Sequence, residues 1–393
     1  MLSCELLRRA RIATSLMFFA NGMVLAIWAT NIPGLKHTLV LSDQQLGIAL
    51  SAFAAGTMLT LYLAGALVTR IGSRNTLLLG GLLVALVVPL CALATSALGL
   101  AIAVFLLGVG NSVADVAMNT HGTLIEARRN RPLMSSFHAV FSIGGLAGAS
   151  AVATLLSDTL GAAQCLGLAG LLMAAVTLLA ARWLGDLRPQ AVTPEASPSG
   201  FIWPNRALLY IAALCFLALF IERTVIDWSA LYLTDVSLAS GNTAAFAFGA
   251  FSLAMALGRL GGGYLIRHFG TNPVLCASGA LGALGLALVI GMPQAGSAIA
   301  GFILVGIGLA NMIPMLYTQA SRAIPGAPGL GLAMNGTLAY TGFLIAPPVI
   351  GALSDALGLK LAMLLPLLAF VLLMGSHLRK HRGELAGRCS PAA

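Results

Sequence analysis

The chain alternates long apolar segments with short polar connections, and the apolar segments carry almost no charge. No Lys, Arg, Asp or Glu occurs across the 54 residues of 268–321 or across the 40 residues of 75–114. A bilayer core of about 30 Å is crossed by about 20 apolar residues in a helix, so each of these stretches must fold back once inside a membrane. The pattern predicts an integral membrane protein.

At this spacing the pattern predicts twelve transmembrane helices. One long polar connection, 183–206, carries four prolines and indicates a cytoplasmic linker. We therefore expect a six-helix bundle at 1–182, the linker at 183–206, and a second six-helix bundle with a short cytoplasmic tail at 207–393. The expected spans are 12–33, 44–68, 76–95, 98–121, 133–156, 161–182, 207–233, 243–266, 273–292, 295–318, 329–352 and 359–378.

An internal repeat supports this division. A shift of 197 to 200 residues places GALVTRIG at 65–72 on GYLIRHFG at 263–270, and LLSD at 155–158 on ALSD at 352–355. The same shift places Trp28 on Trp228. A parallel duplication of six spans predicts two halves related by a pseudo-twofold axis normal to the membrane, with a substrate site between them near the midplane. The expected fold class is all-α integral membrane.

Composition and charge agree with this interpretation. Apolar residues make up 59% of the chain and charged residues 8%, which is too few charges for a water-soluble surface. A net charge of +9 could indicate a nucleic-acid partner, but 17 of the 21 basic residues lie at every second connection instead of on one patch. By the positive-inside rule, both termini are expected in the cytoplasm, with the chain in the inner membrane.

The connection between the second and third spans carries a recognisable motif. Gly65, Leu67, Arg70, Gly72 and Arg74 match the signature of that loop in the major facilitator superfamily, which the chain resembles over its whole length. This resemblance implies two pseudo-twofold six-helix bundles. Thr69 stands where the family has an Asp that helps latch the two halves together, so the resemblance implies an altered or absent latch here.

Two longer segments narrow the resemblance. Residues 111–148 and 222–233 resemble a branch of bacterial inner-membrane facilitators near the fucose permeases, which includes MosC-like and YbjJ-like proteins. The pattern of drug antiporters in the fifth span is incomplete, because Gly144, Gly145 and Gly148 match but Ala149 replaces a proline. The branch implies little about cargo, and the missing proline disfavours a drug antiporter.

Ionisable side chains within spans are costly, so they usually face a cavity and indicate a site. Asp115 shares a helix face with Asn111 and Asn119, at a spacing of four residues, and that face is not expected to contact lipid. His138 lies about 10 Å into the fifth span, close enough in depth to meet Asp115. We interpret these residues as solute ligands, with Asp115 and His138 also as proton carriers; the alternative is hydrogen bonding that only joins helices.

Glu222 lies near the middle of the seventh span, about 16 residues beyond Arg206. A carboxyl group at this depth can take up a proton and release it as water enters, which makes Glu222 the strongest candidate for proton coupling. The alternative is a structural partnership with Arg223. Arg223 and Asp227 are spaced to pair along the helix, and for these two we favour the structural interpretation.

Further candidates for the solute site come from the remaining spans. Asn21 and Trp28 lie seven residues apart on one helix face, although Trp28 and Trp228 could instead be anchors at the membrane surface. Asn335 falls at the repeat position of His138, at an offset of 197. The full set of expected solute ligands is Asn21, Trp28, Asn111, Asp115, Asn119, His138, Asn311 and Asn335.

These patterns predict a secondary active transporter that moves a small polar solute, such as a sugar or polyol, by alternating access with protons as the coupling ion. No nucleotide-binding loop, nucleophile elbow or metal cluster occurs, so we expect no enzyme activity, no cofactor and no metal. The expected partners are the solute, protons and membrane lipid, with the chain as a monomer. The alternatives are an exporter of drugs or amphipathic metabolites and a non-transporting receptor or scaffold.

Overall fold

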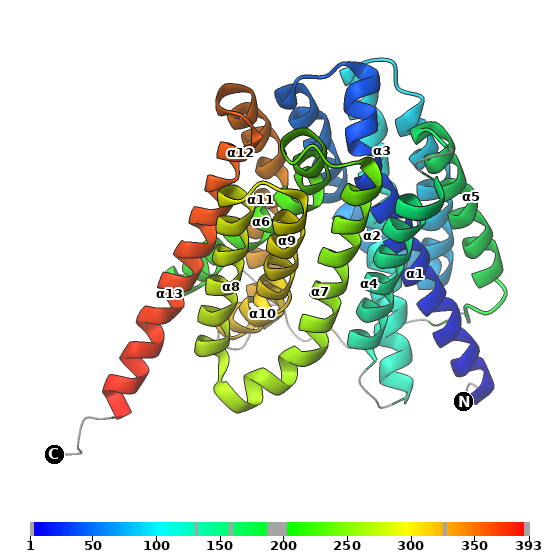
Figure 1. Cartoon of the computed structure of the whole chain (residues 1–393). Helices are drawn as coiled ribbons and strands as arrows, with labels where there is room; N and C mark the ends of the chain where they lie inside the picture. Colours follow the sequence, from blue (N-terminus) through cyan, green and yellow to red (C-terminus); the bar gives the residue numbers. More distant parts are fainter. Residues whose placement is uncertain are drawn as a thin grey trace.

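The structure is a computed structural model that describes residues 4–129, 133–156, 160–185, 187, 203–324 and 328–388. Within these residues it contains helices and no strand. Figure 1 shows the helices standing side by side in two groups, with α4 and α7 where the groups meet. The helix α1 begins, and α13 ends, on the same face of the molecule (Figure 1). We call this the basic face and the opposite one the far face.

The first group contains six membrane crossings. Its helices are α1 (Cys4–Leu39), α2 (Asp43–Ala92), α3 (Ala97–Arg129), α4 (Met134–Ala151) with the π-helix η1 (Val152–Leu156), and α5 (Ala162–Ala180). The second group contains α6 (Arg206–Leu231) with the π-helix η2 (Tyr232–Val236), α7 (Gly241–Phe269), α8 (Thr271–Gly291), α9 (Ala295–Leu309), α10 (Met312–Arg322), α11 (Pro328–Leu357), α12 (Leu359–Ala362) and α13 (Leu364–Arg388).

Eleven helices in the described residues are long and apolar enough to span a membrane, and one of them crosses twice. The 50-residue helix α2 would measure about 75 Å if it were straight, more than twice the thickness of a bilayer core. It is broken at Gly72, whose φ of 84° and ψ of 156° are not helical. The arms 43–71 and 73–92 are therefore two separate crossings, and the twelve predicted spans are confirmed.

The internal repeat is visible in the backbone itself. Val40 and Leu238 are the two non-glycine residues with positive φ among the described residues, and they lie 198 positions apart. Of the three positive-φ glycines among the described residues, Gly72 and Gly270 have the same separation. Turns that need an unusual backbone angle thus recur at one offset, as a duplicated six-span unit requires. The linker prediction, by contrast, lies mostly outside the described residues, and the bundle boundaries remain a prediction.

Close backbone contact holds neighbouring helices together. A Cβ atom at Gly144 of α4 would overlap the backbone oxygen of Phe19 on α1, and a Cβ at Gly342 of α11 would overlap that of Phe216 on α6. Small residues allow this approach in lipid, where van der Waals packing drives helix association. Because 144 and 342 are again 198 apart, the two bundles use the same packing at the same place in the repeat.

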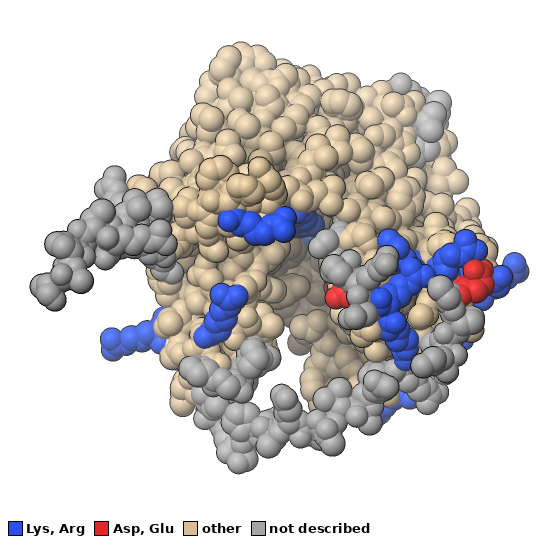
Figure 2. Space-filling model, turned by 90° about the horizontal axis from the view of Figure 1, so that it is seen from below, with Lys and Arg blue, Asp and Glu red and all other residues tan. Residues whose placement is uncertain are grey.

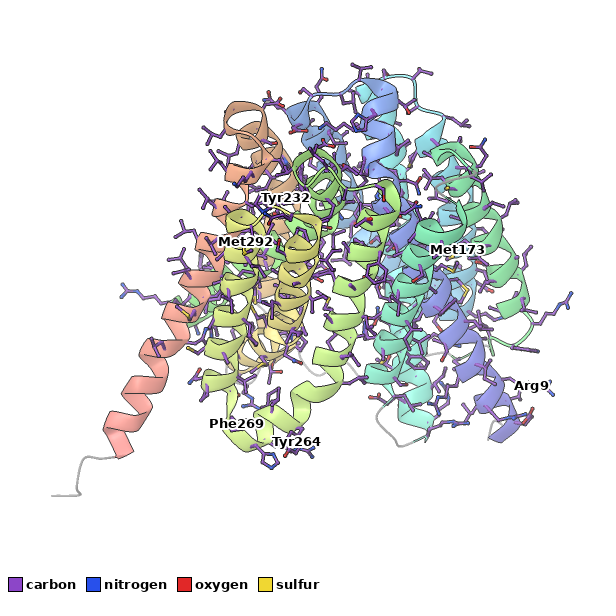
Figure 3. The ribbon with its side chains drawn as sticks, in the orientation of Figure 1. Arg9, Met173, Tyr232, Tyr264, Phe269 and Met292 are labelled. Atoms are coloured by element: carbon purple, nitrogen blue, oxygen red, sulfur yellow. The ribbon has the colours of Figure 1, made fainter. Side chains whose placement is uncertain are left out.

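The interior and the surface are both apolar, as expected in a membrane. Met173 and Tyr232 are fully buried within their bundles, whereas Tyr264 and Phe269 lie exposed where α7 reaches the basic face (Figure 3). The Tyr232 hydroxyl donates to the backbone oxygen of Val289 at 2.6 Å. A buried hydroxyl group needs a hydrogen-bond partner within the protein, whereas exposed leucine and phenylalanine side chains can contact lipid without one.

Two side chains of the loop with the superfamily signature form hydrogen bonds with backbone oxygens of the first bundle. The Thr69 hydroxyl donates to the backbone oxygen of Ala66 at 2.8 Å, one turn earlier in α2. The Arg74 guanidinium donates to the backbone oxygen of Ala181 at 2.8 Å, just after α5. Thr69, at the position where the resemblance implies an Asp, therefore makes a local hydrogen bond, and the altered latch remains a prediction.

Candidate functional site

A cavity of about 290 Å³ lies between the two bundles. The first bundle supplies residues of α1, α2, α3 and α4 to its wall, and the second supplies residues of α6, α7 and α11. Viewed from the basic face, the molecule is hollowed between the bundles, with Lys and Arg side chains around the hollow (Figure 2). Both halves of the repeat therefore contribute to one cavity.

The first bundle presents a polar wall on α3. The Asp115 carboxylate accepts a hydrogen bond from Asn119 at 3.1 Å, and its other oxygen has no partner among the described residues. One turn away, the Asn111 side-chain oxygen accepts from Asn21 of α1 at 3.2 Å. Asn111 and Asp115 line the cavity, while Asn21 and Asn119 do not line it and hold them by these hydrogen bonds. This wall can offer a solute both a hydrogen-bond donor and an acceptor.

The second bundle presents an ion pair. Glu222 of α6 lies with its Oε1 atom 3.7 Å from the Arg259 Nη2 atom of α7, and both side chains line the cavity. The pair is partly exposed, with 16% of the Glu222 side chain and 31% of the Arg259 side chain accessible. At this separation the two charges stabilise each other without a short hydrogen bond.

A second arginine joins the bundles across the cavity. Arg223 donates from Nε to the Asp227 carboxylate at 2.7 Å, so these two form the expected pair along α6. The guanidinium carbon also lies 4.9 Å from the ring centre of Phe53, on α2 of the first bundle. This is a cation–π contact, which is strong when water is excluded, and Arg223 is only 4% exposed. Its Nη2 atom is buried and has no hydrogen-bond partner among the described residues, and Arg223 is one of the residues that line the cavity.

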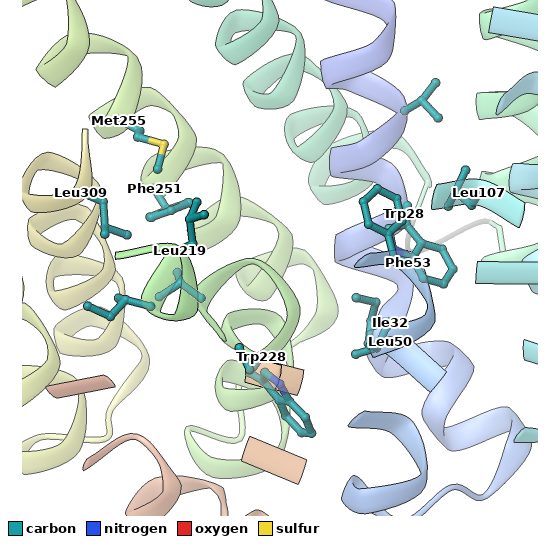
Figure 4. Close-up of a cluster of buried hydrophobic side chains, with 14 of the residues drawn as sticks. Trp28, Ile32, Leu50, Phe53, Leu107, Leu219, Trp228, Phe251, Met255 and Leu309 are labelled. Atoms are coloured by element: carbon teal, nitrogen blue, oxygen red, sulfur yellow. The ribbon is translucent and has the colours of Figure 1, made fainter. Parts of the chain in front are cut away.

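Aromatic rings cover much of the remaining wall. Figure 4 shows Trp28 and Phe53 on one side of the gap between the bundles and Phe251 with Met255 on the other. His138 meets the ring of Phe18 edge-on at 5.5 Å between ring centres. Apolar and aromatic walls with a few polar groups that fix the orientation of a ligand are typical of small-molecule sites.

On the far face, charged residues join the bundles. Lys36 at the end of α1 forms ion pairs with Asp43 at 2.6 Å and with Asp235 of the second bundle at 2.8 Å. Asp355 at the end of α11 accepts hydrogen bonds from the backbone N–H groups of Asp43 and Gln44, at 2.9 and 3.1 Å. Asp43 also accepts a hydrogen bond from the Ser354 hydroxyl. The bundles are thus connected on the face opposite the hollow.

The structure brings together five of the residues named from the sequence. Trp28, Asn111, Asp115, His138 and Glu222 all line the cavity. Asp115 and His138 make no direct contact with each other there; His138 contacts Phe18, and Asp115 contacts Asn119.

The two tryptophans are not anchors at the membrane surface. Trp28 is 3% exposed and Trp228 is fully buried. The anchor interpretation of these residues is therefore wrong, because such an anchor must reach the lipid headgroups.

Besides Asn21 and Asn119, which do not line the cavity, two further expected solute ligands lie away from it. Asn311 donates to the backbone oxygen of Gly258 at 2.8 Å, between α7 and α10. Asn335 is fully buried and donates to Cys215 Sγ at 3.4 Å, between α6 and α11. Both side chains join helices of the second bundle and do not line the cavity wall.

The displacement of Asn335 has a geometric cause. The packing glycines 144 and 342 set the offset in this helix at 198, so Gly336 and not Asn335 corresponds to His138. In this helix the offset changes to 197 at the match of 155–158 with 352–355, where the π-helix η1 lies, because a π-helix accommodates one extra residue. One residue rotates a side chain by about 100° around the helix, which turns Asn335 into the bundle.

Sequence reasoning missed Arg259 and the aromatic wall. Arg259 lies within a predicted span, where its charge is as costly as that of Glu222. It therefore indicates a residue that faces a cavity, in the same way as Glu222 does. Its pairing with Glu222 depends on how α6 lies against α7, which the sequence does not state. The phenylalanines gave no signal, because an apolar ring in a membrane helix is expected whichever way it points.

The comparisons with known proteins agree on one family. The sequence profile described as Major Facilitator Superfamily matches residues 14–347. The membrane protein MosC of Rhizobium meliloti is 31% identical over 90% of this chain and 85% of its own length. A glucose/galactose transporter of Brucella abortus is 26% identical over 91% of this chain and 90% of its own length.

A solved structure shows the same fold. A variant of the nucleoside transporter NupG superposes with a TM-score of 0.81 over 94% of this chain and 99% of its own, at 12% identity. The profile covers most of the chain, and the expected resemblance to bacterial facilitators is confirmed by the match to MosC. The chain therefore belongs to the Major Facilitator Superfamily and is a membrane transporter, not an enzyme.

Proposed function

We propose that this protein is a proton-coupled transporter of a small polar solute with a ring, such as a sugar or a cyclic polyol. The observation that supports this most is the cavity itself, to which both bundles contribute polar groups and aromatic rings. The relative from Brucella abortus, named a glucose/galactose transporter, supports a sugar-like cargo. The chain is expected in the inner membrane, with the basic face toward the cytoplasm.

The size of the cavity is compatible with this cargo. Small-molecule sites measure roughly 300 to 1,000 Å³, so about 290 Å³ is enough for a solute of one ring. In the proposed complex, Asn111 and Asp115 bond the hydroxyl groups. Trp28, Phe53 and Phe251 stack on the apolar faces of the ring. Closure of the basic face around the solute, with opening of the far face, completes one transport cycle.

Proton coupling is assigned to Glu222. While ionised it pairs with Arg259 at 3.7 Å, and a proton on the carboxyl group would remove that pairing. Arg259 would then lack its ion-pair partner and would interact with another group on the cavity wall. Protonation of Glu222 would in this way change the arrangement of the solute ligands. Asp115 and His138 are the second candidates, because they lie on the same cavity from the first bundle.

The test begins with thermal-shift screening of the purified protein against sugars, polyols, amino acids and vitamins. A solute that stabilises the protein is then followed into proteoliposomes under an imposed pH gradient. We expect Glu222→Gln to abolish accumulation driven by the gradient while downhill exchange continues, because the amide cannot release a proton. Glu5→Gln, which removes an exposed carboxylate at the start of α1, serves as the control and should behave as the unmodified protein.

The aromatic wall also suits a second cargo, an amphipathic compound that the protein would export. Seven of the lining residues are Phe or Trp, which favours this alternative. The incomplete antiporter pattern disfavours it, because Ala149 stands where drug antiporters carry a proline. Deletion of the protein distinguishes the two proposals: an exporter requires increased sensitivity to the compound, whereas a sugar transporter requires loss of uptake. If uptake by Glu222→Gln had the same pH dependence as uptake by the unmodified protein, the assignment of proton coupling to Glu222 would be contradicted.

A further inference from the structure

A second groove, of about 340 Å³, opens on the outside of the first bundle at the basic face. It is separate from the central cavity, with which it shares no lining residue. The lining comes from the first half of α1, the last residue of α3 and one residue of α4. The residues are Arg8, Arg11, Ile12, Ser15, Leu16, Phe19, Arg129 and Val140.

One end of the groove is strongly basic. Arg11 and Arg129 make no hydrogen bond or ion pair with any other described residue, while Arg8 pairs with Glu5 at 2.9 Å. The first turns of α1 and the last turn of α3 carry five arginines and two glutamates, an excess of three positive charges. One of those glutamates, Glu126, is already occupied by the backbone N–H groups of Leu133 and Met134. Two guanidinium groups are thus available to an anion from outside.

The other end of the groove is apolar. Ile12, Leu16 and Phe19 follow one another at spacings of four and three residues on one face of α1, with Val140 of α4 beside them. Ile12 is 42% exposed. From Arg8 to Phe19 the helix rises by about 16 Å, close to half of a bilayer core of about 30 Å. The whole groove is therefore about as deep as one leaflet, with a cationic end at the membrane surface and an apolar part, from Ile12 to Phe19, of about 10 Å.

We propose that this groove binds an anionic phospholipid. The phosphate lies against Arg8, Arg11 and Arg129, and one acyl chain follows Ile12, Leu16 and Phe19 into the leaflet. Guanidinium groups bind phosphate through paired, charge-assisted hydrogen bonds, and basic pockets between transmembrane helices on the cytoplasmic side suit anionic headgroups. A free phosphate would leave the apolar part of the groove unused, so the two-part lining favours a lipid. Because α1, α3 and α4 belong to one bundle, the lipid stabilises that bundle whether or not solute is bound.

The experiment measures lipid binding to the purified, delipidated protein by native mass spectrometry. Phosphatidylglycerol and phosphatidylcholine with the same acyl chains are titrated separately, and glycerol phosphate is added in a third arm. The test variant is Arg11→Gln with Arg129→Gln. The control is Arg267→Gln with Arg322→Gln, which removes two exposed charges from the same face of the second bundle, away from the groove.

Each arginine near a membrane surface contributes about a fivefold gain in affinity for an anionic lipid. We therefore expect the test variant to bind phosphatidylglycerol about 25-fold more weakly, with phosphatidylcholine binding unchanged and the control variant like the unmodified protein. Equal weakening in the test and control variants would overturn the proposal, since it would indicate a general effect of charge. The proposal would also be overturned if the unmodified protein bound phosphatidylcholine, or glycerol phosphate, as tightly as phosphatidylglycerol.

A second variant keeps the test independent of folding. Ile12→Ser changes an exposed side chain in the apolar part and leaves every arginine in place. It should weaken binding of long-chain phosphatidylglycerol and leave the response to glycerol phosphate unaltered. Undiminished binding of the long-chain lipid by this variant would contradict the placement of the acyl chain.

Discussion

Lys36 offers the sharpest test of the connection on the far face. Its ammonium group lies 2.6 Å from a carboxylate oxygen of Asp43 in its own bundle and 2.8 Å from one of Asp235 in the other. Substitution by Met keeps most of the side-chain volume and removes the charge that lies between these two acids. We expect Lys36→Met to favour the conformation in which the far face is open.

The magnitude follows from the exposure of the pair. The side chains of Lys36 and Asp235 are 15% and 25% accessible, so solvent screens the interaction only in part. A fully exposed ion pair contributes about 0 to 1 kcal/mol, and a hydrogen bond to a charged group about 1.5 to 3 kcal/mol. An intermediate value of about 1 to 2 kcal/mol changes the ratio of the two conformations by roughly five- to thirtyfold. Repulsion between the acids left behind acts in the same direction.

The assay is a distance measurement across the far face. Spin labels on cysteines at Thr38 of the first bundle and Leu357 of the second, both exposed, report the separation by pulsed electron paramagnetic resonance. Lys36→Met should add a population at longer distance. Lys360→Met is the matched control, because Lys360 is exposed and forms no ion pair among the described residues. A distance distribution in Lys36→Met identical to that of the control would refute the reasoning.

Two further predictions concern packing and solute binding. Gly144→Ala places a methyl group against a backbone oxygen of α1 and should destabilise the protein by about 1 to 3 kcal/mol in thermal melting. Gly167→Ala, where the added group meets open space, should change the melting temperature little. Asp115→Asn and His138→Ala should each weaken binding of the transported solute at least tenfold in a thermal-shift titration, with unaltered melting of the free protein. Wild-type affinity in both variants would assign the two residues to structure alone.

The spans could be predicted because lipid leaves few choices. A chain without charges for 40 or 54 residues has to cross a membrane and return, and the connecting turns carry the arginines. The repeat could be predicted because equivalent turns in the two bundles need equivalent residues, and these residues match in the sequence. Gly72 and Gly270, which both adopt positive φ, lie within the sequence match that indicated the duplication.

The residues that line the cavity could be predicted only where a charged side chain would be costly to expose to lipid. Asp115 and Glu222 are charged, so their direction followed from energetics. Asn335 is neutral, and its direction depended on a register that a π-helix near the end of α4 changes by one residue. Phe53 and Phe251 carried no directional information, because phenylalanine suits lipid, core and cavity alike. Their positions follow from packing between helices far apart in the sequence.

The central claim is that the cavity between the bundles is an aqueous solute site reached from one face at a time. A cysteine at Ser252 on the cavity wall, in a chain whose six native cysteines are replaced, allows labelling with a membrane-impermeant maleimide from each side. We expect labelling from the basic face that slows as the transported solute reaches saturation. Absence of labelling from both faces, or a rate that saturating solute leaves unchanged, would contradict the claim.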